Sequence, residues 1–99
     1  MDVRLGLSPV LRKEIVEVIL RHCDPDKIVV YGSRARGDYN RESDIDIAID
    51  CKQEIGFLHP ILEEDVRTLV KFDIVNLRAA NANLKEEISR EGVVIYEKI

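Results

Sequence analysis

Apolar positions recur along the chain with two periods, and together they predict alternating helices and strands. Spacings of three or four residues predict three amphipathic helices, from Ser8-Pro9 to about Cys23, from Leu58 to Leu69, and from Leu84 to Gly92. Short apolar runs predict four strands, over residues 27–31, 44–50, 70–77 and 93–96. A short helical turn is also expected at 33–36. This order predicts an α/β (α+β) fold with a small mixed sheet of about four strands and helices on one face.

The second predicted strand carries two acids among its apolar residues. Successive side chains in a strand point to opposite faces, so Asp44 and Asp46 share one face while Ile45 and Ile47 share the other. At a rise of about 3.3 Å per residue, the two acids lie about 6.6 Å apart along the backbone. From there two carboxylates can converge on a pair of divalent cations roughly 3.5–4 Å apart, as in two-metal phosphoryl transfer.

The third predicted strand contains another acid, Asp73, between Phe72 and Ile74. A buried carboxylate without a partner is costly, so Asp73 must face solvent, a cation or a hydrogen-bond donor. An exposed strand face would explain this acid as well as a site would. We therefore expect the sheet face that carries Asp44, Asp46 and Asp73 to stay open.

Each of these features has a plain structural explanation when taken alone. An Asp-x-Asp pair on a strand is most often a solvated face, and Gly32-Ser33 after a strand is most often a turn. The combination is more informative, because an apolar strand, the Gly-Ser turn, ten residues (Arg34 to Ser43) and Asp44-Ile45-Asp46 on a second apolar strand form one unit.

This unit resembles the nucleotidyltransferase motif of the DNA polymerase beta-like superfamily, and Phe72-Asp73-Ile74-Val75 resembles the strand that contributes its third carboxylate. The shortness of the chain points further to the minimal nucleotidyltransferases, the MNT antitoxins that pair with HEPN toxins. The resemblance implies a nucleotidyltransferase palm formed by a single domain, residues 1–99. The chain ends after the palm, so we expect another protein to present the acceptor.

The resemblance also implies a role for each motif residue. The acids expected to be catalytic and to hold two Mg²⁺ ions are Asp44, Asp46 and Asp73. The residues expected to contact the triphosphate of ATP are Gly32, Ser33, Arg34 and Arg36.

Composition and charge limit the classes of partner. The net charge of −4 argues against nucleic acid as a direct partner. The cluster of Arg34, Arg36 and Arg41 is either a solvated loop or a patch that meets a triphosphate or a partner protein. Cys23 and Cys51 are expected to be free thiols. Without a signal peptide, a run of 18 apolar residues or a lipidation motif, we expect a soluble, cytoplasmic protein that does not bind membranes.

Three functions are compatible with these residues. The first, implied by the resemblance, is a protein adenylyltransferase that moves AMP from ATP to a tyrosine of a HEPN toxin and so acts as its antitoxin. The second is a catalytically silent antitoxin that only masks its toxin. The third is a transferase subunit for a small-molecule or RNA acceptor that works with a separate recognition subunit. The intact Gly-Ser turn and the three acids favour the first.

Overall fold

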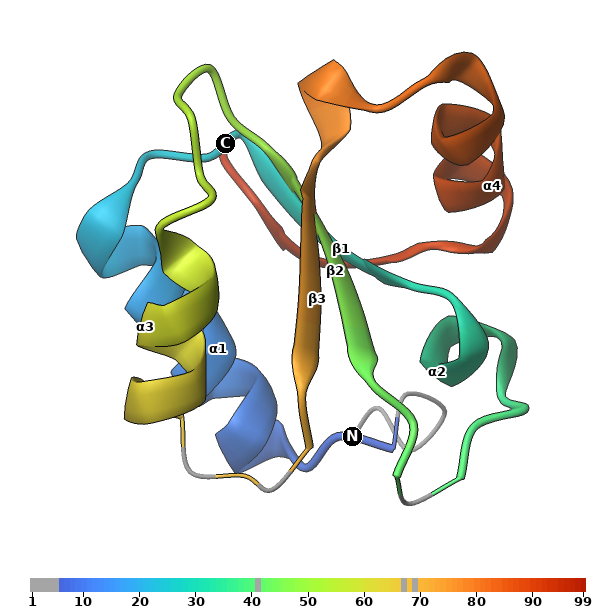
Figure 1. The fold of residues 1–99 in the computed structure, drawn as a ribbon, viewed down its shortest axis with the longest axis horizontal. Helices are drawn as coiled ribbons and strands as arrows, with labels where there is room; N and C mark the ends of the chain where they lie inside the picture. Colours follow the sequence, from blue (N-terminus) through green and yellow to red (C-terminus); the bar gives the residue numbers. More distant parts are fainter. Residues whose placement is uncertain (1–5, 41, 67, 69) are drawn as a thin grey trace.

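The structure, a computed structural model, describes residues 6–40, 42–66, 68 and 70–99. Helices and strands alternate along them in the following order: α1 (Pro9–His22), β1 (Lys27–Tyr31), α2 (Ser33–Arg36), β2 (Ile45–Asp50), α3 (Leu58–Asp65), β3 (Phe72–Asn76), the 3-10 helix η2 (Leu77–Ala79), α4 (Ala82–Glu91) and β4 (Val93–Glu97). Figure 1 shows their arrangement around a central sheet.

The sheet is mixed, as the sequence predicts. Its strand order is β3-β2-β1-β4, with β1 antiparallel to both β2 and β4 and with β2 parallel to β3. A parallel pair needs a long connection between its strands, and α3 lies in that connection. As a result, the C-terminal end of β1 lies beside the N-terminal ends of β2 and β3.

Helices α1 and α3 pack on one face of the sheet, to the left of the strands in Figure 1. The strand residues in the core beneath these helices include Ile45 and Ile47, which the alternation predicts to share one side, together with Ile28, Val30 and Ile49. They meet helix residues such as Ile15, Ile19 and Leu62. Burial of this apolar surface is the main favourable contribution to folding.

The expectation of helices on one face only is corrected by α4. Its residues Leu84 and Ile88 pack against Val29, Tyr31 and Ala48, which belong to the other face of the sheet. Helix α4 therefore lies to the right of the strands in Figure 1, opposite α1 and α3. Asp46 and Asp73 belong to this second face as well, since Asp46 lies opposite Tyr31 on one side and Asp73 on the other.

The predicted boundaries are close to the observed ones. The strand at 27–31 and the turn at 33–36 are confirmed, whereas β2 and β3 are shorter than the predicted 44–50 and 70–77. Helix α3 ends at Asp65, with Val66 as its C-cap. The predicted helix residue Leu69 and the clustered Arg41 lie outside the described residues.

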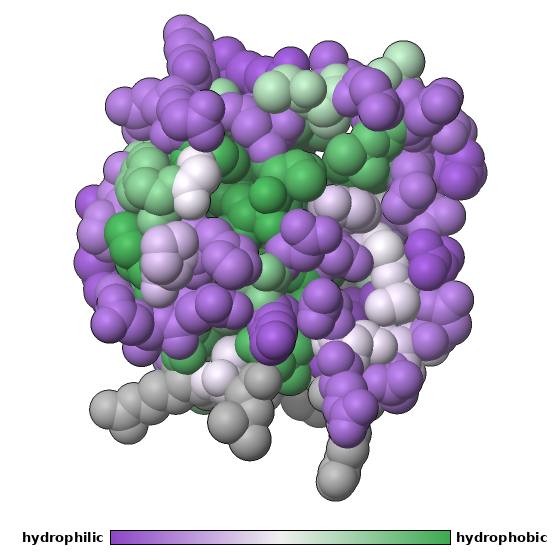
Figure 2. Space-filling view, viewed as in Figure 1, coloured by the Kyte–Doolittle hydropathy of each residue, from purple (hydrophilic) through white to green (hydrophobic). Residues whose placement is uncertain are grey.

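The surface seen from this side is mostly hydrophilic, with an apolar patch in the upper middle of the view (Figure 2). None of the described helices combines the length and the apolar character needed to cross a membrane.

Candidate active site

The site begins where β1 turns into α2. Gly32 has φ +74° and ψ −151°, a conformation that glycine adopts without steric cost. A Cβ at this position would lie 2.2 Å from Oδ2 of Asp46. The absence of a side chain at Gly32 therefore allows the backbone of the Gly-Ser turn to lie directly against a carboxylate of the neighbouring strand.

The acids of the motif come together through strand register. Asp46 lies opposite Tyr31 of β1 on one side and opposite Asp73 of β3 on the other. Asp44 immediately precedes β2, two residues before Asp46, and is exposed. Asp46 is half-buried and Asp73 is exposed. The two predicted carboxylate strands therefore lie side by side, with their acids at one end of the sheet.

These three acids differ from several other acids of the protein in having no partner among residues 6–40, 42–66, 68 and 70–99. Among the described residues, no hydrogen bond or ion pair reaches the carboxylates of Asp44, Asp46 and Asp73. By contrast, Asp26 and Asp50 are both paired with Arg78.

The pKa of Asp46 reflects the negative charges that surround it. Its pKa is raised from 3.8 to about 6, first by burial and then by the charges of Asp73 and Asp44, while Arg36 acts in the opposite direction. A nearby cation would remove this repulsion and favour the ionised form. The end of the sheet thus concentrates negative charge that the protein itself does not neutralise.

This arrangement fits divalent cations such as Mg²⁺. The donors are all carboxylate oxygens, which hard cations prefer, and they belong to adjacent backbone positions. Within the described part of the chain, no three His, Cys, Asp or Glu side chains are close enough to form a ready-made metal cluster. The residues that would hold the cations are Asp44, Asp46 and Asp73.

Tyr31, the last residue of β1, lies opposite Asp46 and packs with Leu84 and Ile88 of α4. Its side chain is buried, and its pKa is raised to about 12 by burial and by the charges of Asp46, Asp73 and Glu87. The phenol therefore remains protonated at neutral pH and offers an O–H beside the acids.

Arg34 was expected to contact phosphate, but the structure gives it a different environment. Its side chain is only 4% exposed. Nε and Nη2 donate to the carbonyl oxygen of Ser43, at 3.3 and 3.1 Å, and Nη1 donates to that of Gly6 at 3.2 Å. The guanidinium also stacks on the ring of Tyr39, 4.9 Å from its centroid. Because Ser43 directly precedes Asp44, Arg34 fixes the loop that leads into the acids.

Arg36, the other predicted phosphate contact, is exposed on α2. Its Nε donates to Asp38 at 3.3 Å and its Nη1 to Glu91 of α4 at 3.1 Å. Among the described residues, no acceptor is bonded to Nη2 of Arg36. This nitrogen can therefore donate to an incoming anion.

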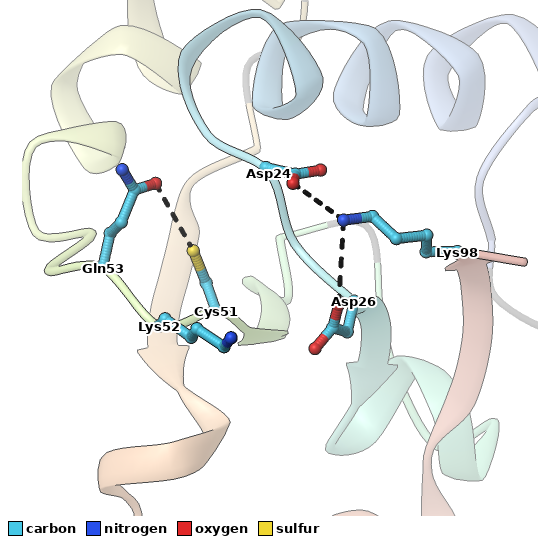
Figure 3. A pocket seen from close by; sticks show the side chains of 6 residues that line it. All are labelled: Asp24, Asp26, Cys51, Lys52, Gln53 and Lys98. Atoms are coloured by element: carbon cyan, nitrogen blue, oxygen red, sulfur yellow. Dashed lines mark hydrogen bonds and ion pairs between the residues drawn. The ribbon is translucent and has the colours of Figure 1, made fainter.

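A separate hollow of about 290 Å³ lies at the opposite end of the sheet, and Figure 3 shows the side chains that line it. Nζ of Lys98 is 2.7 Å from Oδ2 of Asp24 and 3.9 Å from Oδ1 of Asp26. Asp24, Asp26 and Lys98 in the lining of the hollow therefore pair with one another. The hollow also lies at the end of the strands that is far from Asp46. This hollow does not extend the site.

The structure therefore brings together Gly32, Ser33, Arg36, Asp46 and Asp73, with Asp44 at the edge, and turns Arg34 inward. Sequence reasoning missed Glu91, which binds Arg36 from 55 positions further along the chain. It also missed the position of Tyr31 opposite Asp46. No local pattern indicates either arrangement, since the first depends on how α4 packs on the sheet and the second on the register between β1 and β2.

Comparison with known proteins gives a consistent result. The profile of the family described as "Polymerase beta, Nucleotidyltransferase" matches residues 13–99. The chain is 36% identical over 77 residues to "Putative protein adenylyltransferase MJ0141" of Methanocaldococcus jannaschii, a match that covers 71% of this chain and 78% of the relative.

Solved structures show the same fold. One chain of a toxin–antitoxin complex with AMP-PNP superposes with a TM-score of 0.70 and 25% identity, covering 88% of this chain and 73% of the other. A chain from the complex of a tri-AMPylated HEPN toxin of Shewanella oneidensis with its MNT antitoxin superposes with a TM-score of 0.68 and 18% identity, covering 90% and 71%.

Proposed function

The chain belongs to the polymerase beta nucleotidyltransferase family, and we propose that it transfers AMP from ATP to a tyrosine hydroxyl of a partner HEPN toxin, acting as the antitoxin. The observation that carries this proposal is a set of acids at the end of β2 and β3, beside the Gly-Ser turn, that have no partner in the part of the chain that the structure describes. A protein that only masked a toxin would have no use for such concentrated charge.

In this proposal the Gly-Ser turn binds the triphosphate. Gly32 lets the backbone approach the phosphates, and Ser33 offers its hydroxyl and the first N–H of α2. Arg36 adds a positive charge at the mouth of the site through Nη2. Arg34 is left out of the phosphate contacts, because its donors bind Ser43 and Gly6.

Asp44, Asp46 and Asp73 would hold two Mg²⁺ ions, whose chemistry is to neutralise the phosphate charge and to lower the pKa of the attacking hydroxyl. Asp46, the most buried of the three, is fixed between β1 and β3 and serves as the rigid ligand. Asp73 lies on the edge strand and is exposed, so it faces the side from which an acceptor can enter. It is therefore the acid placed to take the acceptor's proton.

The choice of substrate and acceptor is supported by the relatives. The M. jannaschii relative is named as a protein adenylyltransferase, and one similar structure is a complex with AMP-PNP. Another is a complex in which the HEPN toxin carries AMP. These findings concern those proteins, and they favour a protein acceptor over RNA or a small molecule here.

The test mixes the purified protein with Mg²⁺, ATP labelled at the α-phosphate, and the product of the neighbouring gene. The double variant Asp44→Asn/Asp46→Asn runs alongside, together with a binding assay for the complex. We expect label on a tyrosine of the partner with the wild-type protein and none with the variant, while both proteins still bind the partner.

The alternatives give different results. A masking antitoxin would transfer no label and would neutralise the toxin equally well in both forms. Label that appears only on added RNA or on a small molecule would indicate the third function. Either result would refute the proposal.

A further inference from the structure

Helix α4 contributes a glutamate to the mouth of the proposed nucleotide site. Oε2 of Glu91 accepts a hydrogen bond from Nη1 of Arg36 at 3.1 Å, and Oε1 lies 3.3 Å from Nη2 of Arg90. The Glu91 side chain is 20% exposed, whereas Arg36 is 42% exposed. The pair joins α2, at the phosphate end of the motif, to the last turn of a helix that is distant in sequence.

The position of Glu91 is unfavourable for the helix itself. It is the last residue of α4, where the helix dipole favours positive charge and disfavours a carboxylate. Helix stability therefore does not explain an acid at this position. The contact with Arg36 provides a reason outside the helix.

The last turn of α4 is firmly seated on the sheet. Ile88 is buried against the second face, and the N–H of Gly92 donates to the carbonyl of Ile88 at 2.8 Å. A Cβ at Gly92 would lie 2.5 Å from Cγ1 of Val29, so the chain passes this strand in close contact. Glu91 stands between these two anchored residues and is a fixed point for the flexible side chain of Arg36.

Arg36 is held in a defined direction by this contact. The carboxylate of Asp38 accepts a hydrogen bond from Nε of Arg36, and that of Glu91 accepts one from Nη1. The remaining nitrogen, Nη2, has no acceptor among the described residues. Arg36 belongs to α2, which begins directly after Gly32, and the backbone of Gly32 lies against the Asp46 carboxylate. Holding two nitrogens of a guanidinium leaves the third oriented before a ligand arrives, which reduces the entropy lost on binding.

We propose that Glu91 is a positioning residue for nucleotide binding, which holds Arg36 so that its free Nη2 meets the triphosphate. The inference rests on the proposed function for the identity of the ligand. It assigns α4 as a wall of the nucleotide site, in addition to its packing on the sheet.

The test measures the Kd of AMP-PNP with Mg²⁺ by calorimetry, and the KM and kcat of AMP transfer, for Glu91→Ala, Glu91→Gln and the wild type. We expect Glu91→Ala to raise Kd and KM about fivefold with little change in kcat, because one charge-assisted hydrogen bond that orients Arg36 is lost. Glu91→Gln keeps an oxygen that accepts from Arg36 and should restore most of the affinity.

Glu86→Ala is the matched control. Glu86 is an acid of the same helix and pairs with Arg90, but it does not contact Arg36. It should leave Kd and KM unchanged. Removal of Arg36 should abolish the effect of Glu91→Ala, because Glu91 acts through that side chain.

Unchanged Kd and KM in Glu91→Ala, or a tighter Kd, would overturn the inference, since the latter would mean that Glu91 competes with phosphate. If the wild type binds AMP-PNP with the expected dependence on Glu91 but transfers no AMP, the proposed function fails and the positioning role stands. If the wild type binds no AMP-PNP, both fail.

Discussion

At the scale of single residues, the close approach of the Asp46 carboxylate to Gly32 determines the geometry of the site. The carboxylate occupies the volume that a Cβ at Gly32 would fill. A side chain here would displace the most buried of the three acids. The requirement for glycine at this position is therefore set by the site as well as by backbone conformation.

Gly32→Ala should lower the free energy of unfolding by more than the roughly 1–3 kcal/mol expected from its backbone conformation (φ +74°, ψ −151°) alone, and should abolish AMP transfer. Gly37→Ala is the control, because Gly37 also has positive φ (+92°) but its Cβ would meet nothing within 4 Å. Urea denaturation and the transfer assay measure both effects. Equal losses in the two variants would show that the contact with Asp46 does not matter.

The charge on Asp46 should reduce stability at neutral pH. Its pKa is raised to about 6 in the folded protein, so its stabilising contribution is present below pH 4 and is lost as the pH rises through 6. Without Mg²⁺ or nucleotide, Asp46→Asn should therefore be more stable than the wild type at pH 8, by about 1–2 kcal/mol, and this difference should shrink near pH 4.

Asp50→Asn provides the contrast for this measurement. Asp50 lies on the same strand and is paired with Arg78, so its substitution should destabilise the protein at pH 8. Thermal denaturation of both variants at the two pH values tests the prediction. An Asp46→Asn protein that is less stable than the wild type at pH 8 would contradict it.

The sequence indicated the acids at this scale but not their neighbours. The alternation within residues 44–50 placed Asp44 and Asp46 on one face, and the apolar run around Asp73, taken together with the motif upstream, indicated a third acid. The environment of Arg34 was not predictable, because its partners at Gly6 and Ser43 depend on how the loop folds. An arginine in a polar loop has the same local pattern whether it is buried or exposed.

At the scale of elements, β3 is an edge strand that needs protection. The carbonyl oxygen of Lys71 accepts a hydrogen bond from the N–H of Ile45 in β2. Because successive carbonyls along a strand point in opposite directions, the carbonyl of Phe72 points away from β2. Nε2 of His59, on α3, lies 2.8 Å from this oxygen. The helix thereby covers the outer edge of the strand immediately before Asp73.

His59→Ala should leave the Phe72 carbonyl without this donor, lower the free energy of unfolding by about 1 kcal/mol and loosen the start of β3. Hydrogen exchange of the β3 amides should become faster in the variant. Glu63→Ala is the control, since it removes the longer 3.9 Å contact of His59 with Glu63 but keeps the bond to Phe72. Unchanged exchange in His59→Ala would rule out this role.

Local sequence patterns predicted the helices and strands but not how they pack against one another. The spacing of Leu84 and Ile88 indicates an amphipathic helix but carries no information on which sheet face it covers, so α4 was wrongly expected beside α1 and α3. The predicted strands at 44–50 and 70–77 extended one or two residues beyond β2 and β3, whereas the predicted strand at 93–96 ended one residue before β4 does. Element types and order were correct because they depend on local periodicity.

At the scale of the whole molecule, ligand binding should change stability. Mg²⁺ with ATP at about 100 times its Kd should raise the free energy of unfolding by about 2.7 kcal/mol, which is a rise in Tm of about 10 °C or more for a protein of this size. The rise should be absent in Asp44→Asn/Asp46→Asn, and with ATP plus EDTA. An equal rise in the double variant would place the nucleotide elsewhere.

The strand connections have a consequence for the order in which the site forms during synthesis. The antiparallel pair β1–β2 closes over residues 32–44, whereas the parallel pair β2–β3 must wait for the crossover through α3. Contacts between distant segments form more slowly than local ones. We therefore expect a nascent chain on the ribosome to assemble the Gly-Ser turn with Asp44 and Asp46 first, and to add Asp73 only when β3 has emerged.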